Sequence, residues 1–296
     1  MSDFLPYGHQ QISDLDIEAV VNVLRSDWLT QGPQVHNFEK AVARKVGANH
    51  AVAVNSATSA LHLACLVLGL KTGDRLWTVP NTFVASANCG RFCGAGIDFI
   101  DIDPQTWNLS VDHLQNKLEF AHQEGCLPKI LVPVHFAGQP TEQEQIWDLA
   151  KQFGCKVIED ASHSIGSKRN DEPIGSCRWS DITVFSFHPV KIITSGEGGM
   201  ALTNDRKLSD LMKRLREHGI NRDPALMNKN PDGPWYYEQI ELGYNYRMTD
   251  IQAALGLSQL DRLEEFVSSR NQLSQRYDKA LEKLPLKRQL IPENNY

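Results

Sequence analysis

The segment from Asp181 to Met200 combines residue types that can do covalent chemistry. An apolar stretch typical of a buried strand ends near Ser186, Lys191 follows, and a glycine-rich turn occupies positions 196–199. A lysine just past a buried strand can lie in a partly dry pocket, which lowers the pKa of its amine. The neutral amine is the nucleophile that forms a Schiff base with a carbonyl compound. The pattern is also consistent with an ordinary solvated lysine, which is what most lysines are.

A carboxylate at the end of a second predicted strand could cooperate with such an amine. Asp160 follows the apolar residues Val157 and Ile158, and ligands bind at the carboxyl ends of strands in open α/β sheets. There it can hold the positively charged ring nitrogen of a pyridine cofactor, or it can cap a helix. His163 can stack on a ring or satisfy a hydrogen bond in the core.

A third segment, from Asn55 to Leu61, joins a predicted strand to a predicted helix. Its small hydroxyl residues and the free N–H groups of a helix N-terminus can bind an anion, although simple capping gives the same pattern. The chain has no GxxxxGK[ST] loop, so nucleoside triphosphate hydrolysis lacks its motif. The glycines at 196–199 do not form GxGxxG and do not lead into a helix, so a dinucleotide fold is not indicated.

The elements that must position these residues alternate between strands and helices, which predicts βαβ units and a mostly parallel sheet covered on both faces. The last two predicted strands follow each other without a helix, so we expect one of them to run antiparallel. One long helical pattern ends before Pro285. We predict strands over 51–54, 76–79, 97–102, 130–134, 156–159, 182–187 and 199–203, and helices over 17–24, 35–46, 59–68, 85–92, 111–122, 142–153 and 249–284.

Composition excludes several classes of protein. The length of 296 residues suggests about two domains, and a hydrophobic fraction of 41% is enough for a large core. With 30 basic and 36 acidic residues the net charge is −6, which argues against nucleic acid or an anionic membrane as the main partner. The six cysteines form no C-x-x-C pair, so we expect reduced thiols. We find neither a signal peptide nor a membrane span and predict a cytoplasmic protein.

In their order along the chain these segments resemble the fold-type I pyridoxal-phosphate enzymes. Within them, the chain is similar to the sugar aminotransferases of the DegT/DnrJ/EryC1/StrS family from about residue 7 to its end. The motifs that carry the resemblance are LTQG at 29–32, NSATSAL at 55–61, EDASHSIGS at 159–167, FSFHPVKIITSGEGG at 185–199 and GYNYRMTDIQAALGLSQL at 243–260.

The resemblance implies a cofactor, pyridoxal 5′-phosphate, and a role for each matching residue. Lys191 would bind the cofactor covalently and move a proton during the reaction, and Asp160 would hold the ring nitrogen. Asn245 would come from the partner subunit, so the resemblance implies a homodimer. The other implied cofactor-binding residues are Ala57, Thr58, Phe83, His163 and Ser186, and the implied substrate-binding residues are Tyr7, Asp27, Trp28, Leu29, Thr30 and Arg247.

The implied reaction transfers an amino group from glutamate to C4 of a UDP-4-keto-6-deoxy-N-acetylhexosamine, or to another nucleotide-linked keto sugar. The resemblance assigns residues 1–248 to a large cofactor-binding domain with an N-terminal helical segment. It assigns residues 249–296 to a connecting helix and the start of a small C-terminal domain. Relatives continue beyond this point, so we expect that domain to be truncated and the chain to be a fragment or a shortened product.

Three other interpretations compete with transamination. Sugar 3-dehydratases share the fold but replace the cofactor lysine by histidine, and Lys191 favours transamination. A cofactor-binding protein without activity is a second alternative, in keeping with the expected truncation. A zinc enzyme built on His135, His163 and His188 is the third, but the sequence lacks H-x-x-x-H or clustered cysteine spacing, so we expect no metal.

Overall fold

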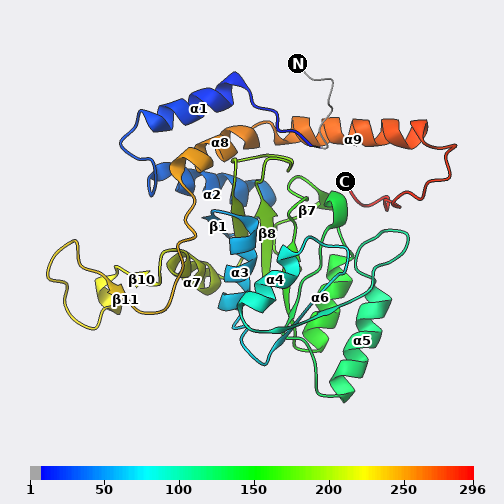
Figure 1. Cartoon of the computed structure of the whole chain (residues 1–296), viewed down its shortest axis with the longest axis horizontal. Helices are drawn as coiled ribbons and strands as arrows, with labels where there is room; N and C mark the ends of the chain where they lie inside the picture. Colours follow the sequence, from blue (N-terminus) through cyan, green and yellow to red (C-terminus); the bar gives the residue numbers. More distant parts are fainter. Residues whose placement is uncertain (1–7) are drawn as a thin grey trace.

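The computed structural model describes residues 8–296. The fold of these residues is built on a seven-stranded sheet. The strand order is β1-β9-β8-β5-β4-β2-β3 (Figure 1). All neighbouring pairs are parallel except those of β9, which runs antiparallel to β1 and to β8. The mostly parallel α/β sheet and its one antiparallel strand are therefore confirmed. The strands are β1 (His50–Val54), β2 (Arg75–Thr78), β3 (Gly96–Phe99), β4 (Ile130–Leu131), β5 (Lys156–Asp160), β8 (Ile182–Ser186) and β9 (Gly199–Thr203).

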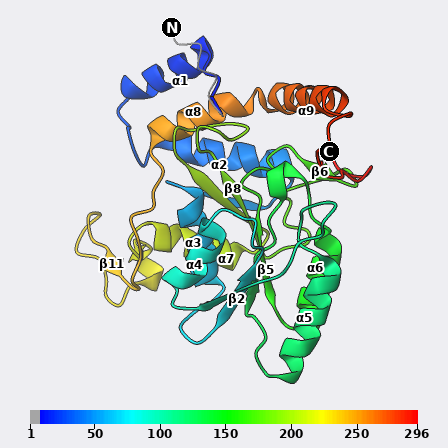
Figure 2. The same ribbon diagram turned by 45° about the vertical axis from the view of Figure 1, so that its right-hand side comes forward.

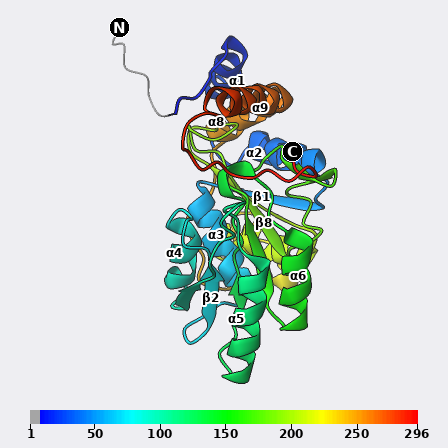
Figure 3. The same ribbon diagram turned by 90° about the vertical axis from the view of Figure 1, so that its right-hand side faces the viewer.

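Helices cover both faces of this sheet, as Figure 3 shows. One face packs against α3 (Ala57–Val67), α4 (Ala85–Phe92) and α7 (Arg206–Arg216). The other packs against α2 (Pro33–Val46), α5 (Val111–Gln123) and α6 (Gln143–Gln152). Burial on both sides explains why the central strands are almost continuously apolar in sequence. Helix α7 was not predicted, although Leu208, Leu211, Met212 and Leu215 have helical spacing.

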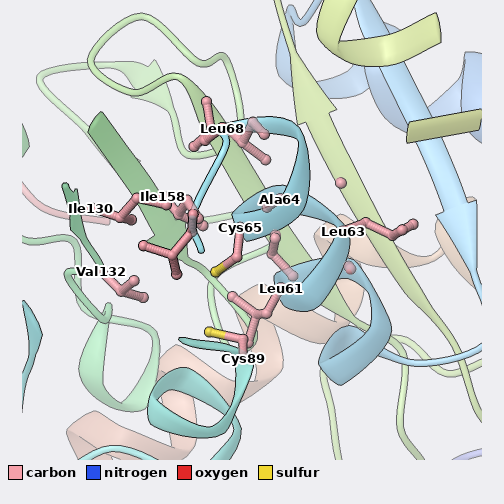
Figure 4. Packing of buried hydrophobic residues seen from close by; sticks show 14 of the residues in the cluster. Leu61, Leu63, Ala64, Cys65, Leu68, Cys89, Ile130, Val132 and Ile158 are labelled. Carbon is pink, nitrogen blue, oxygen red and sulfur yellow. The ribbon is translucent and has the colours of Figure 1, made fainter. Parts of the chain in front are cut away.

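The core between the sheet and α3/α4 fixes the direction in which the end of β5 presents its side chains. Ile158 of β5 packs there with Leu61 and Cys65 of α3 and Cys89 of α4 (Figure 4). Val157 packs into the core on the opposite face. Because side chains alternate along a strand, Asp160 projects on the same face as Ile158, toward α4, and Glu159 projects on the other.

The helical pattern at 249–284 is not one helix, so that prediction was wrong. It is divided into α8 (Asp250–Leu260) and α9 (Leu263–Ala280), with Arg262 between them at φ −101° and ψ 10°. The apolar stripe runs on across the break because Leu260 and Leu263 pack into the same core. The periodicity of apolar residues therefore indicates the buried face that the two helices share, but it does not indicate that the helix is interrupted.

Helix α1 (Asp14–Leu24) lies alongside α8 (Figures 1 and 2). Its Asp16 is fully buried and accepts hydrogen bonds from Ser258 Oγ at 2.6 Å, Gln259 Nε2 at 2.8 Å and Arg262 Nη2 at 2.7 Å. Asp16 also completes a capping box with Ser13, the N-cap residue. This one carboxylate therefore joins the N-terminal helix to the α8–α9 junction.

The remaining elements are short. The predicted strand at 130–134 is reduced to the two residues of β4, because Pro133 has no N–H for a sheet ladder. The last residues of the chain return to the body, where Lys168 N donates to Tyr296 O at 2.6 Å. The described residues contain no helix long and apolar enough to cross a membrane. The short elements are β6 (Lys168–Arg169), β7 (Glu172–Pro173), β10 (Ile220–Asn221), β11 (Glu238–Gln239) and the 3-10 turns η1 (Phe136–Gly138) and η2 (Pro224–Leu226).

Candidate active site

Asp160 lies at the carboxyl end of β5, where the sequence places it. Its backbone N–H donates to Pro133 O at 2.9 Å, and its carbonyl accepts from His135 N at 3.2 Å. Its side chain is buried and hydrogen-bonded on both oxygens: Ser86 Oγ donates to Oδ2 at 2.5 Å and Ser162 Oγ donates to Oδ1 at 2.6 Å. A carboxylate held in this way stays in one orientation at the edge of the sheet.

Lys191 and His163 meet at the same sheet edge. Lys191 Nζ lies 2.5 Å from His163 Nε2, and the loop is fixed by hydrogen bonds from Lys191 N to His188 O at 2.9 Å and from Arg270 Nη2 to Lys191 O at 3.2 Å. Burial lowers the pKa of the Lys191 amine below its ordinary value of 10.5, and the negative charge of Asp160 opposes this shift in part. The half-buried amine is therefore more easily neutral than a surface lysine.

The pKa of His163 is also lowered from its ordinary value of 6.5. Burial is the largest cause, the charges of Lys191 and Arg270 act in the same direction, and the charge of Asp160 opposes them. The imidazole is therefore neutral at neutral pH, and Nε2 can accept a hydrogen bond from Lys191 Nζ. The structure places His163 beside the predicted nucleophile, and its position beside a cofactor ring stays a prediction.

The predicted anion site lies at the start of α3. Ser56 is the N-cap and its Oγ accepts from Ser59 N at 3.1 Å, while the N–H groups of Ala57 and Thr58 have no partner within the helix. Gly199 of β9 is so close that a Cβ there would lie 2.4 Å from Ala57 N, which only glycine avoids. Ser186, at the end of β8, pairs with Gly199, so its buried hydroxyl belongs to the same edge.

Phe83 lies two residues before the first residue of α4 and is 76% exposed. Its carbonyl accepts from Ser86 N at 3.2 Å, so the exposed ring and the hydroxyl that holds Asp160 belong to one turn of chain. An aromatic side chain left this open is available to stack on a planar ligand.

Asn245 and Arg247 lie beside the start of the anion site. Val54 forms a β-bridge with Arg247, Asn55 N donates to Tyr246 O at 2.9 Å, and Asn245 O accepts from Asn55 Nδ2 at 3.5 Å. The side chain of Asn245 is exposed. Its contact with a partner subunit stays a prediction.

The predicted substrate segment, Asp27 to Thr30, lies against the start of α8, where Thr30 forms a β-bridge with Thr249. Its Leu29 O accepts from Asp250 N at 3.0 Å, and Trp28 lines a groove of about 490 Å³ beside α1 and α8. No hydrogen bond or ion pair in the described part of the chain joins this segment to Asp160, His163 or Lys191. Tyr7 lies outside the described residues.

Several residues near the site were missed by the sequence reasoning, namely Ser86, Ser162 and the buried pair of His135 and Glu159. Glu159 Oε2 lies 2.9 Å from His135 Nε2. Burial raises the pKa of Glu159, but hydrogen bonds from His135, Ser180 and Thr183 outweigh burial and leave that pKa below its ordinary value. Thr141 N donates to His135 Nδ1, so the proton on Nε2 points at Glu159. No signal in the sequence pairs these two residues.

The interpretation as a zinc enzyme gains nothing from this arrangement. The Nε2 atom of His135 is hydrogen-bonded to Glu159, and the Nε2 atom of His163 contacts Lys191 Nζ. Across residues 8–296, no three His, Cys, Asp or Glu side chains form a group that could hold a metal.

The donor set does fit pyridoxal 5′-phosphate. An amine of lowered pKa, a buried carboxylate, an exposed aromatic ring and a helix N-terminus are the groups that its aldehyde, ring nitrogen, ring face and phosphate require. The edge shared by β5, β8 and β9 brings these groups together. The chemistry of Lys191, Asp160, Phe83 and the α3 N-terminus therefore agrees with the implied cofactor.

Comparisons with known proteins agree with this reading. Residues 10–295 match the model of the DegT/DnrJ/EryC1/StrS aminotransferase family. The spore coat polysaccharide biosynthesis protein SpsC of Bacillus subtilis is 42% identical over 283 residues, with 95% of this chain and 70% of SpsC covered. A UDP-4-amino-4,6-dideoxy-N-acetyl-beta-L-altrosamine transaminase of Campylobacter jejuni is 39% identical over 279 residues, covering 94% of this chain and 70% of the relative.

Solved structures show the same fold. Helicobacter pylori PseC, an aminotransferase involved in the biosynthesis of pseudoaminic acid, superposes with a TM-score of 0.84 at 32% identity, covering 95% of this chain and 71% of PseC. The PLP-form of the putative sugar aminotransferase Spr1654 from Streptococcus pneumoniae gives a TM-score of 0.82 at 27% identity, covering 94% of this chain and 72% of that chain. The chain belongs to the DegT/DnrJ/EryC1/StrS aminotransferase family, and it is a sugar aminotransferase.

Proposed function

We propose that this aminotransferase transfers the amino group of glutamate to C4 of a UDP-4-keto-6-deoxy-N-acetylhexosamine. The product would be UDP-4-amino-4,6-dideoxy-N-acetyl-β-L-altrosamine, in keeping with the names of the Campylobacter relative and of PseC. One observation carries the proposal: Lys191 Nζ, with a lowered pKa, lies at the same sheet edge as the doubly hydrogen-bonded Asp160 carboxylate.

Pyridoxal 5′-phosphate, when bound, supplies an aldehyde that takes up the amine and a ring that spreads negative charge. Lys191 would hold this group covalently and then, once free, move the proton at the reacting carbon as general acid and base. Its neutral neighbour His163 would accept a hydrogen bond from the amine and orient it. Asp160 would keep the ring nitrogen charged, while Phe83 would cover one ring face.

The remaining assignments complete the pocket. The N–H groups of Ala57 and Thr58 and the hydroxyl of Ser186 would hold the phosphate. Tyr7, Arg247 and the residues from Asp27 to Thr30 are proposed to contact the sugar nucleotide. A cytoplasmic location stays a prediction.

A homodimer is part of this proposal. The connection between β10 and β11 projects to the side of the body in Figure 1 and exposes large apolar side chains, which a second copy would cover. Asn245 follows the β10–β11 pair in the chain and has an exposed side chain that could reach the partner's phosphate site. The exposed apolar residues are Leu226, Trp235 and Tyr237 in the connection, and Ile240 and Leu242 follow directly after β11.

The test is a half-reaction followed by a full turnover. Purified protein loaded with pyridoxal 5′-phosphate is expected to be yellow and to bleach when glutamate is added. Addition of the UDP-4-keto sugar should restore the colour and give a product whose mass shows that an amine has replaced the ketone. Yellow protein that does not bleach would indicate a cofactor-binding protein without transaminase activity. If glutamate bleaches the protein but the UDP-4-keto sugar neither restores the colour nor takes up an amine, the protein is an aminotransferase and the proposed substrate is wrong.

A further inference from the structure

The structure assigns to Ser86 the role of a positioning residue that, together with Thr82, holds the Asp160 carboxylate against the cofactor ring nitrogen. This inference rests on the proposed role of Asp160. Nothing in the motifs that carry the family resemblance includes Ser86 or Thr82, which lie more than 70 positions from Asp160 in the chain.

The direction of each hydrogen bond follows from counting protons. Ser86 Oγ donates its single proton to Asp160 Oδ2 at 2.5 Å. Thr82 Oγ1 lies 2.7 Å from Ser86 Oγ, and since the Ser86 proton is already used, Thr82 must be the donor of this second bond. The chain Thr82–Ser86–Asp160 is therefore polarised toward the carboxylate, and each bond strengthens the next.

Burial makes this chain of bonds effective. Ser86 is fully buried and Asp160 is 5% exposed, so water cannot replace the hydroxyl when it is lost. Ser162 Oγ holds the other carboxylate oxygen at 2.6 Å. Ser162 N also donates to this oxygen, at 3.2 Å. With donors on both oxygens the carboxylate cannot rotate, whereas without Ser86 it keeps donors on Oδ1 alone, can turn, and becomes a stronger base.

The same turn of chain carries the exposed ring of Phe83. Ser86 N donates to Phe83 O at 3.2 Å, so the ring and the hydroxyl are carried by the same turn of backbone. Residues 82–86 would therefore serve two contacts of the cofactor ring, its face through Phe83 and its nitrogen through Asp160.

Matched variants separate this role from ordinary packing. Ser86→Ala removes the donor on Oδ2, and Thr82→Val removes only the second bond while keeping side-chain shape. Thr78→Val is the control, because Thr78 is also fully buried and its Oγ1 donates to Val132 O at 2.8 Å, away from Asp160. Each variant loses one hydrogen-bonded hydroxyl, and only Ser86→Ala and Thr82→Val lose it on the path to Asp160.

The experiment uses the full chain loaded with pyridoxal 5′-phosphate carrying ¹⁵N in its ring, and measures the ¹⁵N resonance and kcat. We expect Ser86→Ala to move the resonance toward the unprotonated ring nitrogen, because the more basic carboxylate takes up the proton, and to lower kcat about 10- to 100-fold. Thr82→Val should give the same changes at smaller size, about two- to fivefold in kcat. Thr78→Val should leave the resonance in place.

Two outcomes distinguish failure of this inference from failure of the proposed function. If Asp160→Asn shifts the ¹⁵N resonance but Ser86→Ala and Thr82→Val match Thr78→Val, the role of Ser86 is overturned and that of Asp160 stands. If Asp160→Asn leaves the resonance unchanged, the role of Asp160 itself is wrong. Should Ser86→Ala not fold, Thr82→Val alone decides the question, since it leaves the Ser86 hydroxyl on the carboxylate.

Discussion

Lys191 Nζ lies 2.5 Å from His163 Nε2, and burial lowers the pKa of both groups. The neutral imidazole accepts a hydrogen bond from the Lys191 nitrogen and fixes the direction of that side chain. Burial therefore favours the neutral amine that attacks a carbonyl group, and His163 orients it.

Capture of pyridoxal 5′-phosphate by the apo-protein is expected to depend on pH with a midpoint below 10.5. Only the neutral amine reacts, and the lowered pKa of Lys191 places more of it in this form at any given pH. The capture rate should therefore rise with pH through the lowered pKa and level off above it. Stopped-flow absorbance measures this rate. The exposed Lys40→Ala variant is the control and should keep the wild-type profile; a wild-type midpoint at or above 10.5 would count against a desolvated amine.

Asp160→Asn is expected to keep the cofactor but lose turnover by about 100-fold or more. The amide fills the same space between Ser86 and Ser162 but carries no charge to stabilise a protonated ring nitrogen. Steady-state kinetics and the cofactor content of the purified variant measure the two effects. Near-normal kcat in this variant would contradict the role given to the carboxylate.

Phe83→Ala is expected to weaken cofactor binding about two- to tenfold, the size of one aromatic stacking contact. The ring is 76% exposed, so its removal should barely change the stability of the chain. Equilibrium titration with pyridoxal 5′-phosphate gives the dissociation constant. Phe120→Ala, on α5, removes another exposed ring and serves as the control. Equal affinities for the two variants would show that Phe83 does not stack on the cofactor.

Asp16→Ala is expected to lower the free energy of unfolding by about 3–5 kcal/mol, since it leaves Arg262 without its buried partner. Burial alone would raise the pKa of Asp16, but hydrogen bonds from Ser13, Ser258 and Gln259 outweigh burial and hold that pKa below 3.8. The unfolded carboxyl titrates near 3.8, so the stabilisation is complete above that pH and is lost as the pH falls through the lower, folded value.

Urea unfolding of the wild type and Asp16→Ala at neutral and at acidic pH measures this effect. The difference between the two proteins should shrink below pH 3.8. Asp14→Ala is the matched control, because Asp14 is exposed in the same helical turn and should cost less than about 1 kcal/mol. An unchanged difference across this pH range would show that the Asp16 charge does not hold α1 to α8.

The sheet and its flanking helices could be predicted because their signals are local. Strands such as β8 are mostly apolar and buried throughout, and capping residues such as Ser56 and Thr249 mark where helices begin. The division between α8 and α9 was missed because the apolar stripe continues through it. Short hairpins such as β10–β11 depend on pairing two residues at a distance, which no local pattern reports.

The site was predictable to the extent that its residues follow strand ends. Lys191, Asp160 and the start of α3 each terminate or follow an element, so the topology brings them to one edge. Ser86 was missed because its link to Asp160 spans 74 positions and depends on how α4 packs on β5. The Lys191–His163 contact was missed for the same reason, since it arises between two loops.

Borohydride reduction followed by peptide mapping tests the central claim most directly. The protein is loaded with pyridoxal 5′-phosphate, its C=N bond is reduced to a stable amine, and the modified peptide is identified by mass. We predict a single cofactor-labelled site at Lys191, absent from Lys191→Ala. Label on another lysine, or an unmodified Lys191 in yellow protein, would contradict the assignment of this residue as the one that binds the cofactor.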